Sequence, residues 1–449
     1  MTTDYLRGIK KALTGGEDTP LVLVCNFEAE AFWAKGHLGL PNVPFSGSTR
    51  LVQRMEELGV LLAGPDDFLV LSEDLDPGFR RYAEDLGFAL PTVLVPENVE
   101  PGRPTTEDVL DSPALLAALR ATSGALLPMG TTALEQKLSE VTGLPLAVPN
   151  ADVFERVNSK VYGRRVAVAG GLRPVPGFEC ETVAEFLAVL DEVEPLVAQG
   201  ERVVVKDAYG VSGKGLVVLD STIKASGVRK LVTRRAARTG DDRLHVVVER
   251  WLPKKFDLNY QFTVGRDGGV AFDFVKQALT EDGVHKGHLV PAELQPHHHD
   301  ELRHAAEVIG ARLHADGFSG VAGVDAILGQ DDVLYPLLEI NARLNMSTYQ
   351  GGVTERLLPD GSACLAKHYT LRLAARTPFD AVRAALGPLL DERDGERVVI
   401  TCAGTVNANA ADEAPFEGRL YAILVAPDRA RLADLDSAAH TALLTLETR

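Results

Sequence analysis

The first 150 residues alternate short apolar runs with stretches of helical periodicity. Thr132 and Glu135 have the spacing of a capping box, in which each side chain bonds the backbone of the other residue, and they predict a helix that reaches about Val141. Strands and helices that alternate over short links predict a wound α/β domain with a parallel sheet. The expected strands are Leu21–Asn26, Phe68–Ser72, Thr92–Val95 and Ala125–Met129, and the expected helices include Leu51–Leu58 and Ala114–Thr122.

After residue 150 the pattern changes to hairpins mixed with helices, which predicts an α+β fold for about residues 151–376, with lobes at about 151–252 and 253–376. The remaining piece, about 377–449, is expected to form a small α+β domain. The expected strands are Arg202–Asp207, Gly215–Leu219, His245–Arg250, Asn259–Gly265, Val270–Gln277, Arg397–Cys402 and Leu420–Val425. The expected helices are Val183–Val193, Lys224–Arg238, Asp300–Ala315, Ala363–Arg376, Phe379–Leu386 and Ala430–Leu446.

The run Leu337–Arg343 places polar groups on one face of an expected strand. Side chains two apart in a strand point to the same side, so Glu339, Asn341 and Arg343 project together. On a helix the same three would spread over roughly 200°. A carboxylate, an amide oxygen and a guanidinium suit a hard cation beside a phosphate. A surface strand with solvated charges is the alternative.

An upstream strand, Gly320–Leu328, is expected to form a hairpin with this run and to bring Asp325 toward Glu339. A regular hairpin with an even-length turn would put these two carboxylates on opposite faces, because successive side chains alternate. A shared cation therefore predicts an odd-length turn across Gly329–Val333, or a β-bulge that resets the register. The Asp331-Asp332 pair tolerates the left-handed conformation that such a turn needs.

The segment Val203–Val218 is predicted to be a strand, a glycine-rich loop and a second strand. Its glycines leave backbone N–H groups free to turn toward a phosphate. Lys206 ends the first strand, and burying a lysine is costly unless an anion meets it. The loop is not a Walker A motif, because Gly215 and a strand follow Lys214. The candidate residues are Lys206, Tyr209, Gly210, Ser212, Gly213, Lys214 and Gly215, and an ordinary turn is the alternative.

The next apolar strand, His245–Arg250, ends in a carboxylate and is followed by Trp251, Leu252 and a proline. Free backbone groups near residues 250–252 would suit an adenine, and Glu249 or Asp257 would suit a ribose hydroxyl. The alternative is a strand end with solvated charges, and for Glu249 taken alone that alternative is favoured.

Composition narrows the partners of this chain. At 449 residues and a net charge of −17 it lacks the basic footprint of a general nucleic-acid binder. No apolar run approaches the length of a membrane span, and the N-terminus lacks the pattern of a signal peptide. The four cysteines are far apart and form no CxxC pair, which predicts buried thiols in a reduced, cytoplasmic setting.

As a set, these motifs occur in the order and approximate spacing of an ATP-grasp ligase, which the chain resembles. Lys160, in Asn158-Ser159-Lys160, belongs to the same set. The architecture is similar to that of the pheganomycin-type peptide ligases, with a pre-ATP-grasp domain, the signature Leu337–Tyr349 and a small C-terminal domain. Ala342 stands where a proline is often found in the E-x-N-x-R run, which leaves the ligand face unchanged.

The resemblance implies that two lobes hold ATP and Mg²⁺ between them, with two ions expected and Mn²⁺ as a substitute. Lys160 and Lys206 would contact the α- and β-phosphates, and the glycine-rich loop would close over the phosphates. Glu249 and its neighbours Arg250, Trp251 and Leu252, with Asp257, would hold adenine and ribose. Asp325, Glu339 and Asn341 would bind the metal, and Arg343 would contact the transferring phosphate.

The implied activity is ATP-dependent joining of a small-molecule carboxylic acid to an amine or peptide through an acyl phosphate, in natural-product biosynthesis. Within Lys276–Glu293, an expected mobile loop, Lys286, His285 and His288 are candidates for contacts with the γ-phosphate or the acceptor, and solvated side chains are the alternative. The run His297–His299 is interpreted as a helix entry instead of a metal cluster. A dipeptide or D-amino-acid ligase, a carboxylase and a non-catalytic ATP-sensing protein stay open as alternatives. The substrates and the oligomeric state, a homodimer included, are not fixed by the sequence.

Overall fold

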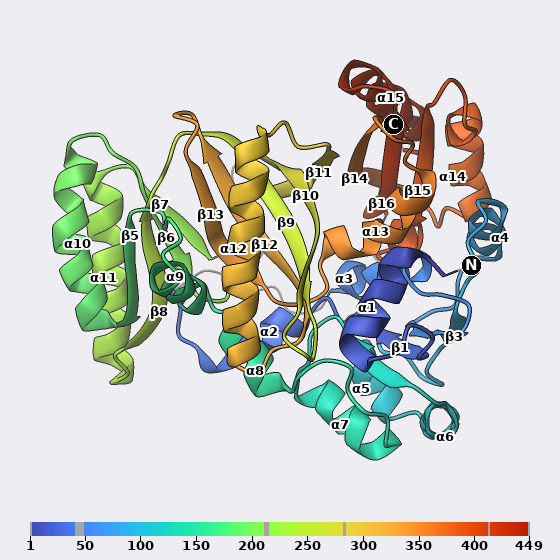
Figure 1. Ribbon diagram of the computed structural model, residues 1–449, viewed down its shortest axis with the longest axis horizontal. Coiled ribbons are helices and arrows are strands. Elements are labelled where there is room, and N and C mark those ends of the chain that lie inside the picture. The colour runs from blue at the N-terminus through green and yellow to red at the C-terminus, as the bar shows by residue number, and fades with distance from the viewer. Residues whose placement is uncertain (1, 41–48, 211–214, 282–283, 412–413, 448–449) are drawn as a thin grey trace.

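The computed structural model describes residues 2–40, 49–210, 215–281, 284–411 and 414–447. The strands among these residues form three sheets (Figure 1). The N-terminal sheet is parallel, with the strand order β3-β2-β1-β4. The predicted wound α/β domain is therefore confirmed. Its strands are β1 (Leu21–Val24), β2 (Phe68–Val70), β3 (Thr92–Leu94) and β4 (Ala125–Pro128).

Short helices surround this sheet. The capping box of Thr132 and Glu135 is present at the start of α7, as predicted. The helix expected at Leu51–Leu58 is divided, because α3 ends at Arg54 and a 3-10 helix, Met55–Leu61, follows it. The α-helices up to residue 142 are α1 (Asp4–Thr14), α2 (Ala29–Trp33), α3 (Arg50–Arg54), α4 (Pro77–Asp85), α5 (Thr105–Leu110), α6 (Pro113–Ala121) and α7 (Ala133–Thr142).

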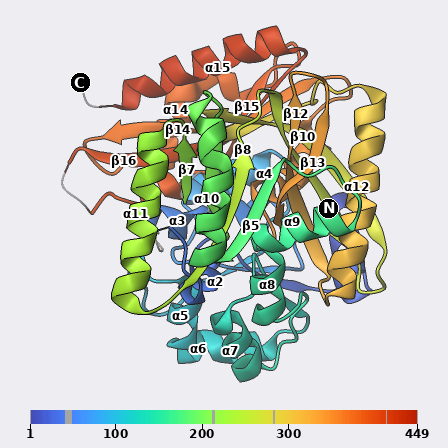
Figure 2. The same cartoon turned by 90° about the vertical axis from the view of Figure 1, so that its left-hand side faces the viewer.

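The second sheet is antiparallel, with the order β5-β8-β6-β7, and helices α10 and α11 cover one face of it (Figure 2). It has a core of its own, to which Leu40 of the N-terminal segment contributes. Residues 37–40 thus connect the first domain to this lobe. The elements are α8 (Ala151–Val157), α9 (Lys160–Ala169), β5 (Gly177–Thr182), α10 (Val183–Ala198), β6 (Val203–Asp207), β7 (Leu216–Leu219), α11 (Thr222–Thr239) and β8 (Arg243–Arg250).

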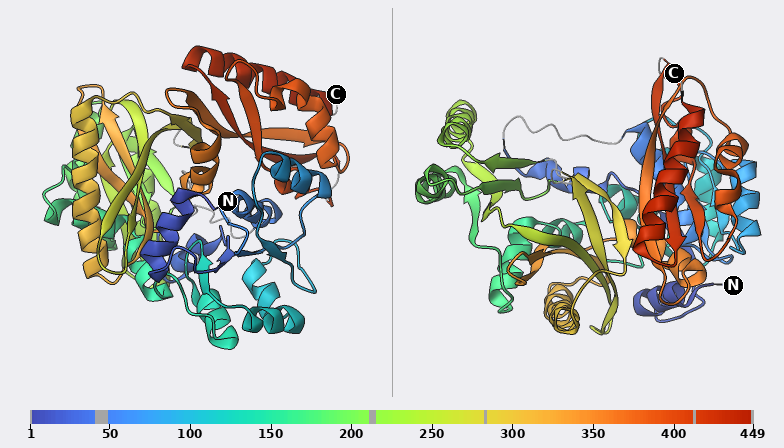
Figure 3. Two further views of the ribbon diagram at one scale, coloured as in Figure 1. Left: turned by 45° about the vertical axis from the view of Figure 1, so that its right-hand side comes forward. Right: turned by 90° about the horizontal axis from the view of Figure 1, so that it is seen from above.

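The third sheet is antiparallel, and its eight described strands follow the order β13-β12-β9-β10-β11-β14-β16-β15. Helix α12 packs against its first strands, and the last strands lie beside the N-terminal domain (Figure 3). The elements are β9 (Lys254–Val264), β10 (Val270–Glu281), β11 (Val284–Val290), α12 (Pro296–Ala315), β12 (Gly320–Gly329), β13 (Leu334–Asn341), α13 (Met346–Leu357), β14 (Ala363–Leu373), α14 (Phe379–Leu386), β15 (Arg397–Cys402), β16 (Phe416–Ala426) and α15 (Arg429–Leu443).

The helix expected at Ala363–Arg376 is wrong, since this segment forms strand β14. Ala, Leu and Lys favour helices, but the period of two decides here, because Tyr369, Leu371 and Leu373 are buried while the residues between them are exposed. Strand β14 pairs with β11 on one side and β16 on the other. Hydrogen bonding therefore continues across the boundary expected at residue 376.

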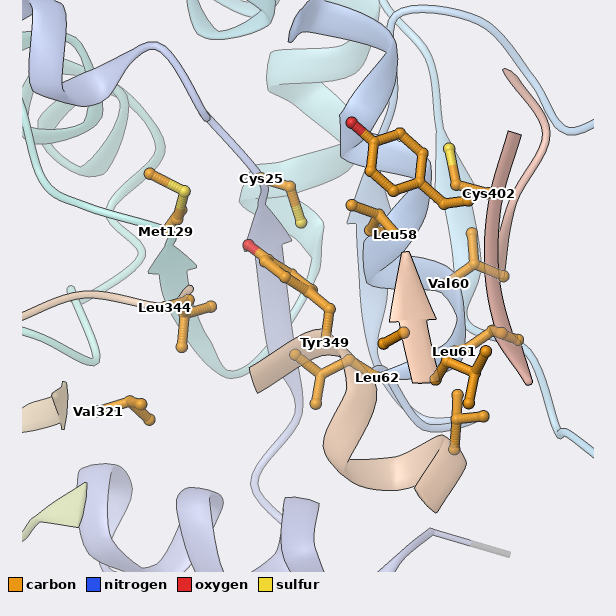
Figure 4. Close-up of a cluster of buried hydrophobic side chains, with 14 of the residues drawn as sticks. Cys25, Leu58, Val60, Leu61, Leu62, Met129, Val321, Leu344, Tyr349 and Cys402 are labelled. Carbon is orange, nitrogen blue, oxygen red and sulfur yellow. The ribbon is translucent and has the colours of Figure 1, made fainter. Parts of the chain in front are cut away.

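One apolar core joins the N-terminal sheet to the third sheet. Figure 4 shows Tyr349 of α13 near Cys25, the residue after β1, with Leu58 and Cys402 also in the cluster. Hydrogen bonds from backbone N–H groups of the third sheet also link it to the N-terminal domain. Ile400 N donates to Tyr82 Oη at 3.0 Å, and Ala403 N donates to a Glu57 carboxylate oxygen at 2.6 Å. All four cysteines are buried and free, and no helix among the described residues is long and apolar enough to cross a bilayer.

Gly323, in the middle of β12, tests how tightly the β12–β13 hairpin is packed. A Cβ there would lie 2.5 Å from Asn345 Nδ2. Asn345 cannot swing away cheaply, because its side chain accepts from Ser347 N and donates to Gln261. We expect Gly323→Ala to destabilise the fold by about 1–3 kcal/mol, seen as a lower melting temperature. Gly227→Ala in α11 is the control, since nothing lies within 4 Å of its added Cβ. Equal melting of Gly323→Ala and the parent would contradict the packing described.

Candidate active site

The β12–β13 hairpin brings its two carboxylates together. Asp325 lies directly opposite Glu339, and Gly323 opposite Asn341. Leu328 pairs with Leu334, so the turn between them is the odd-length Gly329–Val333, closed by Gly329 N donating to the Val333 carbonyl at 2.8 Å. A bulge between Asp325 and Ile327 adds a further shift, and Asp332 has a φ of 65°. The predicted odd turn and shared face are therefore confirmed.

The same face continues across neighbouring strands. Asp325 is also opposite Asn259 of β9, and Asn259 is opposite Lys276 of β10. Asn259 Nδ2 donates to Asp325 Oδ1 at 2.8 Å, and Ser347 Oγ donates to Asn259 Oδ1 at 3.0 Å. Sequence reasoning missed Asn259 and Lys276, because it located their strands without the pairing that aligns them with Asp325.

The carboxylate oxygens of Asp325 and Glu339 lie on one face of the hairpin and suit a divalent cation. Burial, and then the neighbouring Glu339 carboxylate, raise the pKa of Asp325 to about 6. Lys160 Nζ lies 2.6 Å from Glu339 Oε1 and 2.5 Å from the Gly210 carbonyl oxygen. Asn341 Nδ2 donates to Asp325 at 3.3 Å, while its Oδ1 accepts from Arg343 at 2.9 Å. The Asp325 and Glu339 carboxylates fit Mg²⁺ as ligands, whereas Asn341 turns its amide nitrogen toward Asp325 and its oxygen toward Arg343.

Arg343 binds a partner that the sequence did not pair with it. Its Nη2 lies 2.5 Å from Glu30 Oε1, and its Nε donates to the same oxygen at 2.6 Å. Glu30 belongs to α2, just after the first strand of the N-terminal sheet. A carboxylate on helix α2 of the first domain therefore orients the arginine of the hairpin.

Lys206 and Glu249 form an ion pair on the second sheet, across the cavity from the β12–β13 hairpin. Lys206 Nζ lies 2.7 Å from Glu249 Oε2, and Arg164 Nη1 lies 3.2 Å from the other oxygen. Burial lowers the pKa of Lys206, but the carboxylates of Glu249, Glu339 and Asp325 together outweigh burial, and the pKa is raised overall. Lys206 therefore stays charged beside the cavity.

One cavity lies between these two walls. The hairpin supplies Asp325 and Glu339, and the second sheet supplies Lys206, Glu249 and their neighbours. Predicted residues that line it are Lys160, Lys206, Gly210, Gly215, Glu249, Arg250, Trp251, Leu252, Asp257, Asp325 and Glu339, together with apolar Val175, Val204, Leu216, Leu258, Ile327 and Leu338. Charged groups at one end and apolar side chains at the other suit a nucleotide.

Several predicted contacts lie elsewhere or are already used. Tyr209 is turned away from this cavity, with its hydroxyl donating to the Glu155 carbonyl at 2.9 Å and its ring 4.3 Å from that of His37. Arg250 N and Trp251 N donate to the Pro176 and Arg202 carbonyls, so these two N–H groups are not free for adenine, contrary to expectation. Ser212, Gly213 and Lys214 lie outside the described residues.

The segment that was expected to be a mobile loop includes strand β11 in the interior of the third sheet. His288 is buried and does not line the cavity, whereas His285 does. Their Nε2 atoms are 3.1 Å apart, and burial lowers the pKa of His285 to about 4, so this ring is neutral near pH 7. Lys286 lies beside a second hollow, toward β14 and β16.

His297 and His298 begin helix α12, as the helix-entry interpretation predicted. Ligand atoms of these two residues and of Asp332 lie within 4.8 Å of one another. However, His298 Nδ1 accepts from Gln295 N at 3.3 Å, so a neutral ring carries its proton on Nε2, which faces the Asp332 carbonyl. Neither nitrogen then offers a lone pair to an ion.

Comparisons with known proteins show what the sequence and the fold resemble. The family model for the pre ATP-grasp domain matches residues 55–144. The chain is 24% identical over 314 residues, 69% of its length and 68% of the relative's, to a protein of Niallia circulans named [butirosin acyl-carrier protein]–L-glutamate ligase. It is also 24% identical over 280 residues to the carbamoyl phosphate synthase large chain of Xanthomonas axonopodis pv. citri, of which it spans only 23%.

Solved structures show the same fold across the chain. An ADP complex of N5-carboxyaminoimidazole ribonucleotide synthetase matches 94% of this chain and 96% of its own at a TM-score of 0.56 and 12% identity. The biotin carboxylase domain of Hydrogenobacter thermophilus 2-oxoglutarate carboxylase, in complex with MgADP, matches 94% and 89% at a TM-score of 0.54 and 15% identity. The chain contains a pre ATP-grasp domain and has the ATP-grasp fold. The cavity between its second sheet and the β12–β13 hairpin lies where the ATP-grasp resemblance predicts a nucleotide.

Lys206 provides a test of the nucleotide site. We expect Lys206→Met to weaken MgADP binding by about tenfold or more, because the half-buried cation that is expected to contact the phosphates is lost, while Glu249 stays paired with Arg164. Isothermal titration calorimetry measures the Kd. Lys255→Met is the matched control, since Lys255 is exposed and pairs with Asp332 outside the cavity. Unchanged affinity in Lys206→Met would remove this residue from the site.

Proposed function

We propose that this protein is a carboxylate–amine ligase that forms an amide bond through an acyl phosphate. The observation that supports the proposal is that carboxylates and lysines line the same cavity between the β12–β13 hairpin and the second sheet. Asp325 and Glu339 share one face of the hairpin, and the cations of Lys160 and Lys206 line the same cavity. Anionic metal ligands opposite the buried Lys160 and the half-buried Lys206 suit the charge distribution of a metal-bound triphosphate during phosphoryl transfer.

The reaction has two balanced steps. In the first, an oxygen of the acid's carboxylate forms a bond to the γ-phosphorus of ATP, and the bond from that phosphorus to the β–γ bridging oxygen breaks to release ADP. In the second, the amine nitrogen forms a bond to the acyl carbon. The carbon–oxygen bond to phosphate then breaks, inorganic phosphate leaves, and the proton of the nitrogen passes to the released phosphate or to solvent. Both steps depend on positioning and charge stabilisation, so no covalent nucleophile of the protein is required.

The residues divide this work between them. Asp325, Glu339 and Asn341 would hold Mg²⁺, two ions being proposed and Mn²⁺ a substitute, and the metal would offset the charge of the phosphates. Lys160 and Lys206 would bind α- and β-phosphate oxygens. Arg343, oriented by Glu30, would contact the transferring phosphate. His285, in the wall near Asp257 and Thr280, would face the reacting groups as a neutral ring.

The substrates belong to the same proposal. The butirosin relative is named for joining L-glutamate to an acyl-carrier protein, which favours an amino-acid-like acid or amine and a role in natural-product biosynthesis. A dipeptide ligase of the same fold is the alternative. We place the enzyme in the cytoplasm, because its four cysteines are buried free thiols.

Glu339→Gln tests the metal ligands. The amide keeps the shape but removes a hard anionic oxygen, so we expect kcat to fall at least about a hundredfold, by comparison with other losses of transition-state charge stabilisation. Nucleotide binding is expected to be partly retained through Lys160 and Lys206. ADP release in a coupled assay measures turnover, and Glu417→Gln, on an exposed part of β16, is the control. Release of ADP at the parent's rate by Glu339→Gln, at the same Mg²⁺ concentration, would contradict the assignment of Glu339 as a metal ligand.

Hydroxylamine tests the intermediate. If an acyl phosphate forms, the acid and ATP with hydroxylamine should give a hydroxamate and ADP without the natural amine. A panel of the common L-amino acids and dipeptides, with bicarbonate included for the carboxylase alternative, identifies the acid. Release of AMP and pyrophosphate instead would show adenylation and exclude the proposed mechanism.

A further inference from the structure

Helix α11 is basic, although the protein as a whole is acidic. The chain has 46 lysines and arginines against 63 aspartates and glutamates, but the sequence of α11 contains no carboxylate side chain. The helix packs beside α10 on one face of the second sheet (Figure 2). The positive charge of α11 is therefore not offset within the helix. Its cations are Lys224, Arg229, Lys230, Arg234, Arg235 and Arg238.

Some of these cations hold α11 to the rest of the fold. Arg229 lies 2.7 Å from Asp191 of α10, and Lys224 lies 2.6 Å from Asp220, just before the helix. Arg235 donates to two backbone carbonyl oxygens outside the helix. Contacts within the chain therefore account for these side chains.

The remaining cations of α11 have no such contacts. Lys230, Arg234 and Arg238 are exposed, and the described residues supply no hydrogen bond or ion pair to their side chains. They are four positions apart, and like charges at this spacing repel one another and destabilise a helix. Attraction to the negative C-terminal end of the helix accounts for Arg238, in the last turn, but not for Lys230 in the middle. The row therefore lowers the stability of the helix on its own.

Two further unfavourable residues lie on the same side of the helix. Ile223 is 83% exposed, more than any other large hydrophobic side chain that the structure describes. Gly227 lies inside the helix, where glycine is less stable than alanine, although a Cβ there would meet nothing within 4 Å. At about 100° per residue, Ile223, Gly227, Lys230, Arg234 and Arg238 fall within about 80° of the helix surface. We call this set the α11 stripe.

The stripe faces away from the nucleotide cavity. Val203 and Val205 of β6 belong to the core beneath α10 and α11, whereas Val204 and Lys206 of the same strand line the cavity. The second sheet therefore separates the two helices from the nucleotide. A partner on the stripe would leave the cavity open.

A negatively charged helix would offset these costs together. Carboxylates at four-residue spacing would match the cations, an apolar side chain would cover Ile223, and the bare backbone at Gly227 allows close approach. The cations span about 12 Å along the helix, which is too long for one phosphate group. A nucleic-acid duplex would also cover α10, where the exposed carboxylates of Glu185, Asp191 and Glu192 would oppose its phosphates.

We propose that the α11 stripe is a docking surface for an acidic helix of a partner protein. Lys230, Arg234 and Arg238 would pair with carboxylates at positions i, i+4 and i+8 of the partner, and Ile223 would anchor one end of it. Complementary charges of this kind speed association and select the partner, while a buried apolar anchor supplies binding energy. The inference concerns a surface outside the cavity and does not depend on the proposed ligase activity.

A synthetic peptide tests the surface on the full chain. The probe is a fluorescein-labelled helical peptide with three glutamates at four-residue spacing and a leucine on the same side, and a twin peptide carries glutamines instead. Fluorescence anisotropy measures the Kd of each peptide. Lys230→Glu combined with Arg234→Glu reverses the charge of the stripe, and Gly227→Leu covers its bare backbone. Lys137→Glu combined with Arg372→Glu is the control with the same change of charge, on exposed parts of α7 and β14.

We expect the parent to bind the glutamate peptide at least about tenfold more tightly than the glutamine twin. The charge-reversed variant should lose this preference, and Gly227→Leu should raise the Kd about threefold to tenfold, because its side chain keeps the two helices apart. The control variant should bind like the parent. Isothermal titration with MgADP should give the parent's Kd for every variant, which shows that each one is folded.

Three results would overturn the proposal. The first is a parent without a preference for the glutamate peptide, or an equal loss of binding in the control variant. The second is parent-like binding by Gly227→Leu, or equally tight binding of duplex DNA, because either would show a general attraction for polyanions. The third is a parent that is a dimer by light scattering and a monomer after charge reversal, because a second copy of this chain would then cover the stripe.

Discussion

Strand register is the constraint on which the site depends. Glu339, Asp325, Asn259 and Lys276 come from four strands, and each faces the next because the strands pair without a shift at that row. A slip of one residue in any pair would turn a side chain to the opposite face of the sheet. The odd turn and the bulge of the hairpin fix the first of these pairings, and the hydrogen bonds of Asn259 hold Asp325 in place.

Opposite charges occupy the cavity in pairs. Lys160 contacts Glu339, and Lys206 contacts Glu249, each at a salt-bridge distance. A buried ion needs a partner, so these pairs keep the walls stable without a nucleotide. In the proposed reaction Glu339 would bind the metal and Lys160 would bind a phosphate oxygen, in place of the ion pair between them. The site would thus exchange one ionic partner for another and would not expose unpaired charge.

Parts of the chain far apart in sequence complete the site. Glu30 of the N-terminal domain holds Arg343, and residues 37–40 fasten the second sheet through Leu40 N donating to Asp207 Oδ1 at 2.6 Å and His245 N donating to the Leu38 carbonyl at 2.8 Å. The last strands extend the third sheet to the hollow beside His285. The N-terminal and C-terminal segments therefore position chemistry that the central lobes carry.

The sequence by itself determined the elements whose signals are local. The capping box of Thr132, the parallel strands of the first domain and the alternation of Glu339 and Asn341 follow from spacing alone, and the hypothesis that Asp325 and Glu339 share a metal predicted the odd turn. Only the tertiary structure decided the remainder. Asn259, Lys276 and Glu30 enter the site through pairing between strands or packing between domains, and β14 is a strand because neighbouring strands bind it on both sides. Such contacts join residues that are distant in sequence, and no local periodicity records which strand will lie beside which.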